Sequence, residues 1–248
     1  MDTLLNRKIL VAGAAGGVGE GIVRALLERG AMVIDLSRSS ERLDQVRTYL
    51  SDVASGGLVP LVGNLDQDEE GSAQLQQQLR HRFGMLDGAV IAIGAWGEAS
   101  RPLLKVTDRI WAHSIADNLT SHFRAIRMLA PLIRPTTGAL VHLTGLSADR
   151  PFPGAGLIGL TNAAQKSLVM TLAEEVGPAG PRIHEVMLGV IRTRSRERQG
   201  VNNPALYTPR EVGHAVAALI AGESPVADET LHYLVERSKR SASMHGRG

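Results

Sequence analysis

The chain contains no cysteine, so disulfides, a thiol nucleophile and a zinc–thiolate centre are all excluded. It is also poor in aromatic residues, which make up 3% of its 248 residues. The longest apolar stretch, residues 88–97, is too short to cross a bilayer, which takes about 20 residues. No basic-then-apolar signal opens the sequence, and we therefore expect a soluble protein of the cytoplasm without a membrane partner.

Charges of the two signs nearly balance, because 27 lysines and arginines stand against 25 aspartates and glutamates. The formal net charge is +2, and several of the extra cations fall within residues 237–248. This distribution argues against a nucleic-acid partner. Apolar residues make up 44% and charged residues 21%, an average globular composition, and α/β folds often use about 250 residues as one domain.

Short apolar runs alternate with amphipathic segments along most of the chain. The run at residues 8–12 ends in a glycine cluster, and residues 20–29 follow with apolar side chains at helical spacing. We expect Gly30 to close that helix in a left-handed conformation. Further strands are predicted at 31–36, 58–62, 88–93, 139–143, 183–188 and 231–235, and further helices at 69–83, 108–132, 161–176 and from residue 209.

This alternation predicts an α/β protein with a single-domain, doubly wound Rossmann fold, whose central parallel sheet is covered on both faces. The domain is expected to span residues 1–237. Residues 238–248 are rich in serine, glycine and arginine, and we expect a disordered basic tail there.

The turn after the first strand follows the spacing GxxxGxG. Dinucleotide binding needs glycine at such a turn for a positive φ, for close approach of the backbone to a pyrophosphate, and for tight packing of helix on strand. A merely tight turn in an α/β protein is the alternative. We favour a dinucleotide cradle made by Gly13, Gly16, Gly17, Val18 and Gly19.

The chain up to about residue 235 resembles the short-chain dehydrogenase/reductase (SDR) family. The segments that carry the resemblance are the glycine turn and residues 86–94, 108–132 and 182–193. Ile-Ala-Ile at 91–93 stands where the family has Asn-Asn-Ala. The resemblance implies that Asn118 is a catalytic residue, that Ile191 and Thr193 contact the nicotinamide amide and the diphosphate, and that the protein forms a homodimer or homotetramer.

The end of the second strand decides between the two nicotinamide cofactors. An acidic side chain there binds the adenosine ribose of NAD(H), whereas a cation accommodates the 2′-phosphate of NADP(H). This chain has Ser37 at the acidic position and Arg38 next to it, which favours NADP(H) over NAD(H). Arg38 as an ordinary surface charge, and Asp35 as a strand residue in a local polar contact, are the alternatives. Asn64 and Leu65 resemble the residues that line the adenine pocket.

Three of the family's four catalytic positions lack their usual residues. Counting back from Leu-Ala-Glu-Glu-Val at 172–176 places Ile158 on the family's tyrosine and Asn162 on its lysine, and Gly145 then falls on its serine. No Tyr-xxx-Lys exists in the chain, whose only tyrosines are Tyr49, Tyr207 and Tyr233. Neither isoleucine nor glycine can move a proton, and asparagine carries no charge to lower the pKa of a phenol. Ordinary carbonyl reduction by this set of residues is expected to fail.

Other polar residues could supply the missing proton transfer. The candidates are Thr144, Ser147, His113, His122, Lys166 and Glu98. Each also has an ordinary interpretation as a surface, capping or strand-end residue. Suitable chemistry without geometry is weak support, so the arrangement in space has to decide among them.

Two functions from different classes remain open. The first is an atypical oxidoreductase, or a repurposed isomerase or cyclase, that binds NADP(H) and a small apolar substrate in a pocket formed by Leu146, Phe152 and Ile158. The second is a noncatalytic pseudo-enzyme that serves as a redox sensor or a partner subunit. An ordinary ketoreductase is the least favoured, and no metal site is predicted.

Overall fold

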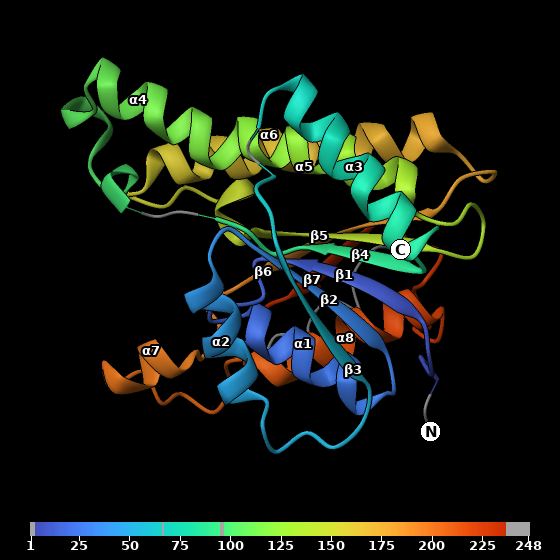
Figure 1. Cartoon of the computed structure of the whole chain (residues 1–248). Coiled ribbons are helices and arrows are strands. Elements are labelled where there is room, and N and C mark those ends of the chain that lie inside the picture. Colours follow the sequence, from blue (N-terminus) through green and yellow to red (C-terminus); the bar gives the residue numbers. More distant parts are fainter. Residues whose placement is uncertain (1–2, 66, 95–96, 237–248) are drawn as a thin grey trace, which may run out of the picture.

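A computed structural model describes residues 3–65, 67–94 and 97–236. These residues contain a seven-stranded parallel sheet of order β3-β2-β1-β4-β5-β6-β7 (Figure 1). The strands are β1 Lys8–Ala12, β2 Met32–Ser37, β3 Gly57–Val62, β4 Gly88–Ile91, β5 Ala139–Gly145, β6 Arg182–Leu188 and β7 Leu231–Leu234. The predicted α/β Rossmann fold with a central parallel sheet is therefore confirmed.

Helices cover both faces of this sheet (Figure 1). The helices are α1 Gly19–Glu28, α2 Ser40–Tyr49, α3 Glu69–Phe83, α4 Asp108–Ile115, α5 Ser121–Leu129, α6 Gly156–Val176, α7 Arg194–Arg198 and α8 Pro209–Ala221. One apolar core lies between the sheet and α1 with α8, and a second lies between the sheet and α3, α5 and α6. Because both faces are buried, the inner strands are almost continuously apolar, as in β4, where every residue is buried.

Local hydrogen bonds explain where α1 ends and where α3 begins. Gly30 has φ of +83°, its N–H donates to the Leu27 carbonyl, and the N–H of Ala31 donates to the Leu26 carbonyl, which closes α1 as expected. The Asp68 side chain accepts a hydrogen bond from the Gly71 N–H at 2.9 Å and caps the start of α3.

Some elements differ from the expectation. The sequence pattern did not predict α2, which buries only Leu43 and Val46, or the short helix α7. The helix predicted at 161–176 begins earlier, at Gly156. The helix predicted at 108–132 is interrupted by a π turn at Ala116–Thr120, which separates α4 from α5. Residues 238–248, predicted to be disordered, lie outside the described residues.

Within residues 3–65, 67–94 and 97–236, no helix has both the length and the apolar character needed to cross a bilayer.

Asp35 is a buried carboxyl group in the middle of the sheet. It lies on β2 between Val11 of β1 and Pro60 of β3, and only 1% of its surface is exposed. Neither of its carboxyl oxygens has a hydrogen-bond partner among the described residues. Burial without a partner raises the pKa of Asp35 to about 6, because the charged form loses its hydration.

We predict that Asp35→Asn stabilises the protein at pH 8 and not at pH 3.5. A pKa near 6 in the folded state, against 3.8 in an unfolded chain, means that stability falls as the pH rises between these values. Such a difference corresponds to about 3 kcal/mol of unfolding free energy above pH 6. Urea unfolding at both pH values measures it, with Asp44→Asn on the surface as the control. An equal effect of Asp35→Asn at both pH values would contradict the prediction.

Candidate functional site

Two cavities lie at the carboxyl edge of the sheet. The larger measures about 600 Å³ and the smaller about 230 Å³. They meet at the glycine turn and at the end of β4, since both are lined by Gly16, Ala92, Ile93 and Gly94. The strand order reverses between β1 and β4, and ligands of open parallel sheets bind at this point.

The glycine turn between β1 and α1 fits closely against its neighbours. Gly13 has φ of +90°, and a Cβ on it would overlap the Ala92 carbonyl, while a Cβ on Gly19 would overlap the Gly13 carbonyl. A Cβ on Gly17 would lie 3.0 Å from Thr193 Cγ2, so the segment after β6 lies against the turn. The N–H groups of Glu20, Gly21 and Ile22 already donate to carbonyls of the turn, so a phosphate would be held by the backbone of the turn itself, at the positive end of the α1 dipole.

The smaller cavity has a cationic wall. The predicted residues that line it are Gly13, Gly16, Ser37, Arg38, Asn64 and Leu65. Arg42 of α2 also lines it, which sequence analysis missed because it did not predict α2. Asp117 is the one carboxylate among the described lining residues, and it lies 3.3 Å from His113 Nε2.

The larger cavity gathers most of the remaining predicted residues. Its lining includes Gly17, Val18, Asn118, Leu146, Phe152, Ile158 and Ile191. Gly19 and Thr193 line neither cavity. Thr193 instead accepts the Arg196 N–H at the start of α7 and lies against Gly17 of the turn.

Gly145, Ile158 and Asn162 all line the larger cavity and lie close together. The Asn162 side-chain amide donates to the Ser147 hydroxyl at 2.9 Å, and a Cβ on Gly145 would lie 2.9 Å from the same Asn162 nitrogen. Ile158 is buried. This wall of the cavity therefore carries an amide and a hydroxyl and no ionisable group.

Asn118 lies in the π turn between α4 and α5. A π turn displaces backbone carbonyls from the regular helical pattern, and such turns are frequent at functional sites. The Asn118 carbonyl accepts a hydrogen bond from the Gln165 side chain of α6. This hydrogen bond joins the π turn before α5 to α6, and residues of both line the cavity.

The six candidates for proton transfer separate clearly. Three do not line the larger cavity and are held in surface ion pairs, His113 with Asp117, Glu98 with Arg109 and Lys166 with Asp149. Three do line it, namely Thr144, Ser147 and His122.

A buried chain of polar side chains runs from the larger cavity into the sheet. His122 Nδ1 lies 2.8 Å from His142 Nε2, and His142 Nδ1 lies 2.7 Å from Glu185 Oε2. The Thr144 hydroxyl donates to Glu185 Oε1. Burial, and then charge repulsion from His142, hold the pKa of His122 well below its ordinary value. Sequence analysis missed His142 and Glu185, whose only signal is a polar residue inside an apolar strand.

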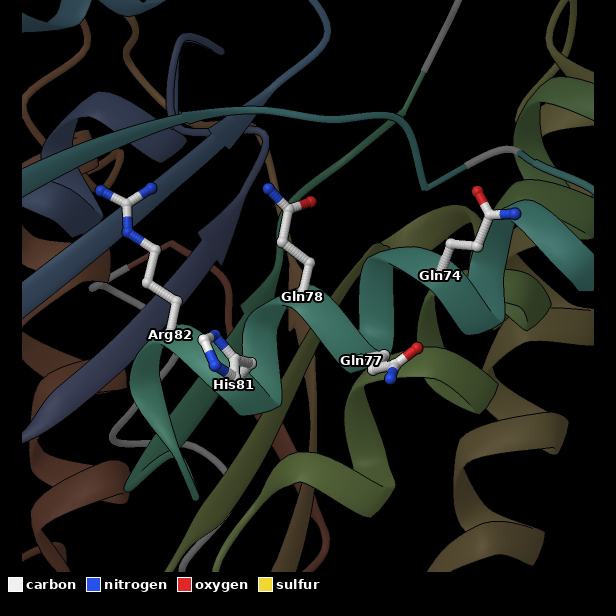
Figure 2. Close-up of a pocket in the computed structure, with 5 residues that line it drawn as sticks. All are labelled: Gln74, Gln77, Gln78, His81 and Arg82. Atoms are coloured by element: carbon white, nitrogen blue, oxygen red, sulfur yellow. The ribbon is translucent and has the colours of Figure 1, made fainter.

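A further hollow lies on the outer surface of α3, far from this edge. Its lining residues all belong to that helix and are Gln74, Gln77, Gln78, His81 and Arg82. Figure 2 shows these side chains spread along the helix without converging on a common point. A surface of this kind does not arrange groups for binding or catalysis.

Comparisons with known proteins were made for the whole chain. Residues 13–228 match the family model described as enoyl-(acyl carrier protein) reductase. The human dehydrogenase/reductase SDR family member 2, mitochondrial, is 28% identical over 196 residues, which is 77% of this chain and 67% of that protein. The 3-oxoacyl-[acyl-carrier-protein] reductase FabG of Haemophilus influenzae is 26% identical over 235 residues, covering 90% of this chain and 94% of that protein.

Solved structures share the fold. A short chain dehydrogenase from Salmonella enterica serovar Typhi has a TM-score of 0.79 at 24% identity and covers 94% of this chain and 97% of its own. The short chain dehydrogenase from Shigella flexneri has a TM-score of 0.80 at 23% identity, with coverage of 94% and 93%. At these sequence identities the solved structures show only that the fold is shared. The match to the family model across most of the sequence carries the assignment further, and the chain belongs to the short-chain dehydrogenase/reductase family.

Proposed function

We propose that the protein is an NADP(H)-dependent oxidoreductase that acts on a small apolar substrate without the Ser-Tyr-Lys set of its family. The observation that carries this proposal is the pair of connected cavities, which has a cationic wall at one end and a largely apolar wall at the other. Relatives named as 3-oxoacyl-[acyl-carrier-protein] reductases support carbonyl chemistry as the reaction type.

The residues of the two cavities fit a dinucleotide. Arg38 and Arg42 would hold the 2′-phosphate, and the backbone of the glycine turn before α1 would hold the diphosphate. Ile191 and the Gly145 end of β5 would face the nicotinamide, which supplies or accepts a hydride when bound. Asn118 and Gln165 keep the adjoining helices in place.

The apolar end of the larger cavity sets the substrate class. Leu146, Phe152 and Ile158 line it, and Phe152 is 52% exposed, so it borders the opening. By resemblance, Gly145, Ile158 and Asn162 stand at the positions of the family's serine, tyrosine and lysine. A substrate here would gain affinity mainly from burial of apolar surface.

A noncatalytic role is the second candidate. It is favoured by the wall of Gly145, Ile158 and Asn162, which offers no ionisable group next to the cofactor position. Trp111 of α4 and Phe123 of α5 are 46% and 45% exposed, and such aromatic residues suit the contact surface of a homodimer or homotetramer. Cofactor binding without turnover would favour this role.

We predict that Arg38→Ala weakens the binding of NADPH by about tenfold or more and leaves that of NADH nearly unchanged. The reason is the loss of a charge-assisted hydrogen bond, worth about 1.5–3 kcal/mol, to the 2′-phosphate. Titration calorimetry measures both affinities, with Arg47→Ala on the exposed side of α2 as the control. Equal affinity of the unmodified protein for the two cofactors would refute the assignment.

We also predict that Gly145→Ser, Ile158→Tyr and Asn162→Lys together increase the NADPH-dependent reduction of a small apolar ketone. A positioned general acid contributes about 10² to 10⁴ in rate, and a gain of at least tenfold is expected in this unoptimised pocket. The control carries Ile158→Phe in place of Ile158→Tyr and lacks only the phenol hydroxyl. An equal gain in the control, or no gain in a triple variant that folds and binds NADPH, would show that these are not the family's catalytic positions.

A further inference from the structure

We propose that His122 Nε2 is the atom that gives and takes the proton in the larger cavity, and that His142 and Glu185 are positioning residues that pass a proton between this atom and the sheet. The proposal rests on the proposed function, because it names the proton donor for the reaction placed in that cavity. It assigns a role to a polar chain that the cofactor and the substrate pocket do not use.

The geometry of the chain is continuous across three elements. His122 belongs to α5, His142 to β5 and Glu185 to β6, and the hydrogen-bonded distances between them are 2.8 Å and 2.7 Å. His142 and Glu185 lie directly opposite each other in the register of β5 and β6. The His122 ring is therefore held by its own helix and by a hydrogen bond to β5. The His142 ring is held by its own strand and by hydrogen bonds to α5 and β6.

Burial isolates this chain from solvent. His122 is 1% exposed, and His142 and Glu185 are fully buried. Both oxygens of Glu185 are engaged, one by His142 and the other by the Thr144 hydroxyl. Among these groups in the described part of the chain, only His122 Nε2 has no hydrogen-bond partner, and His122 lines the larger cavity.

Two arrangements of protons fit these distances, because each ring nitrogen donates or accepts according to its tautomer, and the one that belongs to the proposal has Glu185 ionised. Thr144 donates to Glu185 Oε1, and an ionised carboxyl group accepts the His142 Nδ1–H at Oε2. His142 Nε2 is then the acceptor for His122 Nδ1–H, which leaves a lone pair on His122 Nε2. This form of His122 has its basic lone pair on Nε2, which is buried at the wall of the cavity, so a bound molecule reaches it only when the side chains that cover it move aside.

Acceptance of a proton at His122 Nε2 shifts every proton of the chain by one place. His122 Nδ1 gives its proton to His142 Nε2, and His142 Nδ1 gives its proton to Glu185. Neither ring becomes an imidazolium, which burial opposes at His122. In the resulting form the His122 Nε2–H is a donor toward the cavity, so the same atom serves both directions of a reaction.

The balanced step is the oxidation of a secondary alcohol, or its reverse. The C–H bond breaks and its electron pair leaves as hydride for the oxidised nicotinamide, the O–H bond breaks and its proton goes to His122 Nε2, and the carbonyl double bond forms. The other ionisable side chains among the described lining residues are Arg150 and Arg196. A guanidinium stays protonated in proteins and cannot accept this proton.

A second pair of buried histidines, His184 and His232, serves as a structural comparison for His122 and His142. His184 Nδ1 lies 3.1 Å from His232 Nε2 and also near the Glu229 carbonyl, and His184 Nε2 has no partner among the described residues. His184 lines none of the described cavities, and no carboxyl group accepts from this pair. This pair is a matched control for variants in the chain from His122 to Glu185.

The first test uses a spectroscopic signature. In Glu185→Gln combined with Met187→Leu, which removes the sulfur that lies 2.9 Å from the Thr144 hydroxyl as a second acceptor, Thr144 is expected to donate to the side-chain oxygen and the amide nitrogen to donate to His142 Nδ1. The tautomers of His142 and His122 then invert, and ¹⁵N NMR of histidine-labelled protein is expected to show His122 Nε2 unprotonated in the unmodified protein and protonated in the variant. An unchanged His122 tautomer in a folded protein with both substitutions would overturn the proposal.

The second test measures turnover of NADP⁺ with 1-phenylethanol and of NADPH with acetophenone. His122→Gln is expected to lower kcat by about 100-fold or more in both directions with unchanged affinity for NADPH, and His184→Gln is expected to lower it less than twofold. His122→Phe gives a second variant that cannot transfer a proton. Retained turnover in His122 variants that bind NADPH counts against His122 alone, whereas no turnover in unmodified protein that binds NADPH counts against the proposed function and favours the noncatalytic role. Failure to bind either cofactor counts against the proposed function.

Discussion

A carboxyl group buried within a parallel sheet, one strand in from its edge, constrains much of this structure. Glu185 is fully buried on β6, and a polar group in such a place destabilises the fold unless hydrogen bonds replace those it made to water. His142 and Thr144, both on β5, satisfy its two oxygens. Those contacts require β5 and β6 to pair in one register, since a slip by one residue would turn both side chains to the opposite face.

The hydrogen bonds around Glu185 also help to position α5, which contributes His122 to the larger cavity. His142 binds Glu185 through one ring nitrogen, and its other ring nitrogen forms a hydrogen bond with His122 of α5. The π turn at Ala116–Thr120 comes directly before α5, and Gln165 of α6 bonds to a carbonyl within that turn. The helices around the larger cavity are thus positioned by polar contacts as well as by the apolar core between the sheet and α3, α5 and α6.

The sequence predicted the fold well because its strongest signals are local. Continuous apolar runs mark β1 and β4, and capping residues mark the start of α3. Helix α2 was missed because its face toward the sheet is narrow, with Leu43 and Val46 as its buried residues, and Arg42 was missed with it. The pairing of His142 with Glu185 joins residues 43 positions apart and depends on strand register, which no local pattern reveals. His122 was one of six candidates for proton transfer in the sequence, and the cavity lining reduced these to three.

Stability alone is a poor explanation for the polar chain from Glu185 to His122. Replacing a buried ionic or polar network with apolar residues of similar volume is often neutral or stabilising, so a sheet needs no such chain to hold together. Apolar residues take equivalent places in this core, since Leu140 and Ile183 face each other on the same face of β5 and β6 two positions before His142 and Glu185. The chain ends at a ring nitrogen without a partner, on a side chain that lines a cavity whose described neighbours offer no other group able to accept a proton. His184 Nε2 also lacks a partner among the described residues, and His122 differs from it in two respects that proton transfer requires: it lines a cavity, and its hydrogen-bonded chain ends at a carboxyl group.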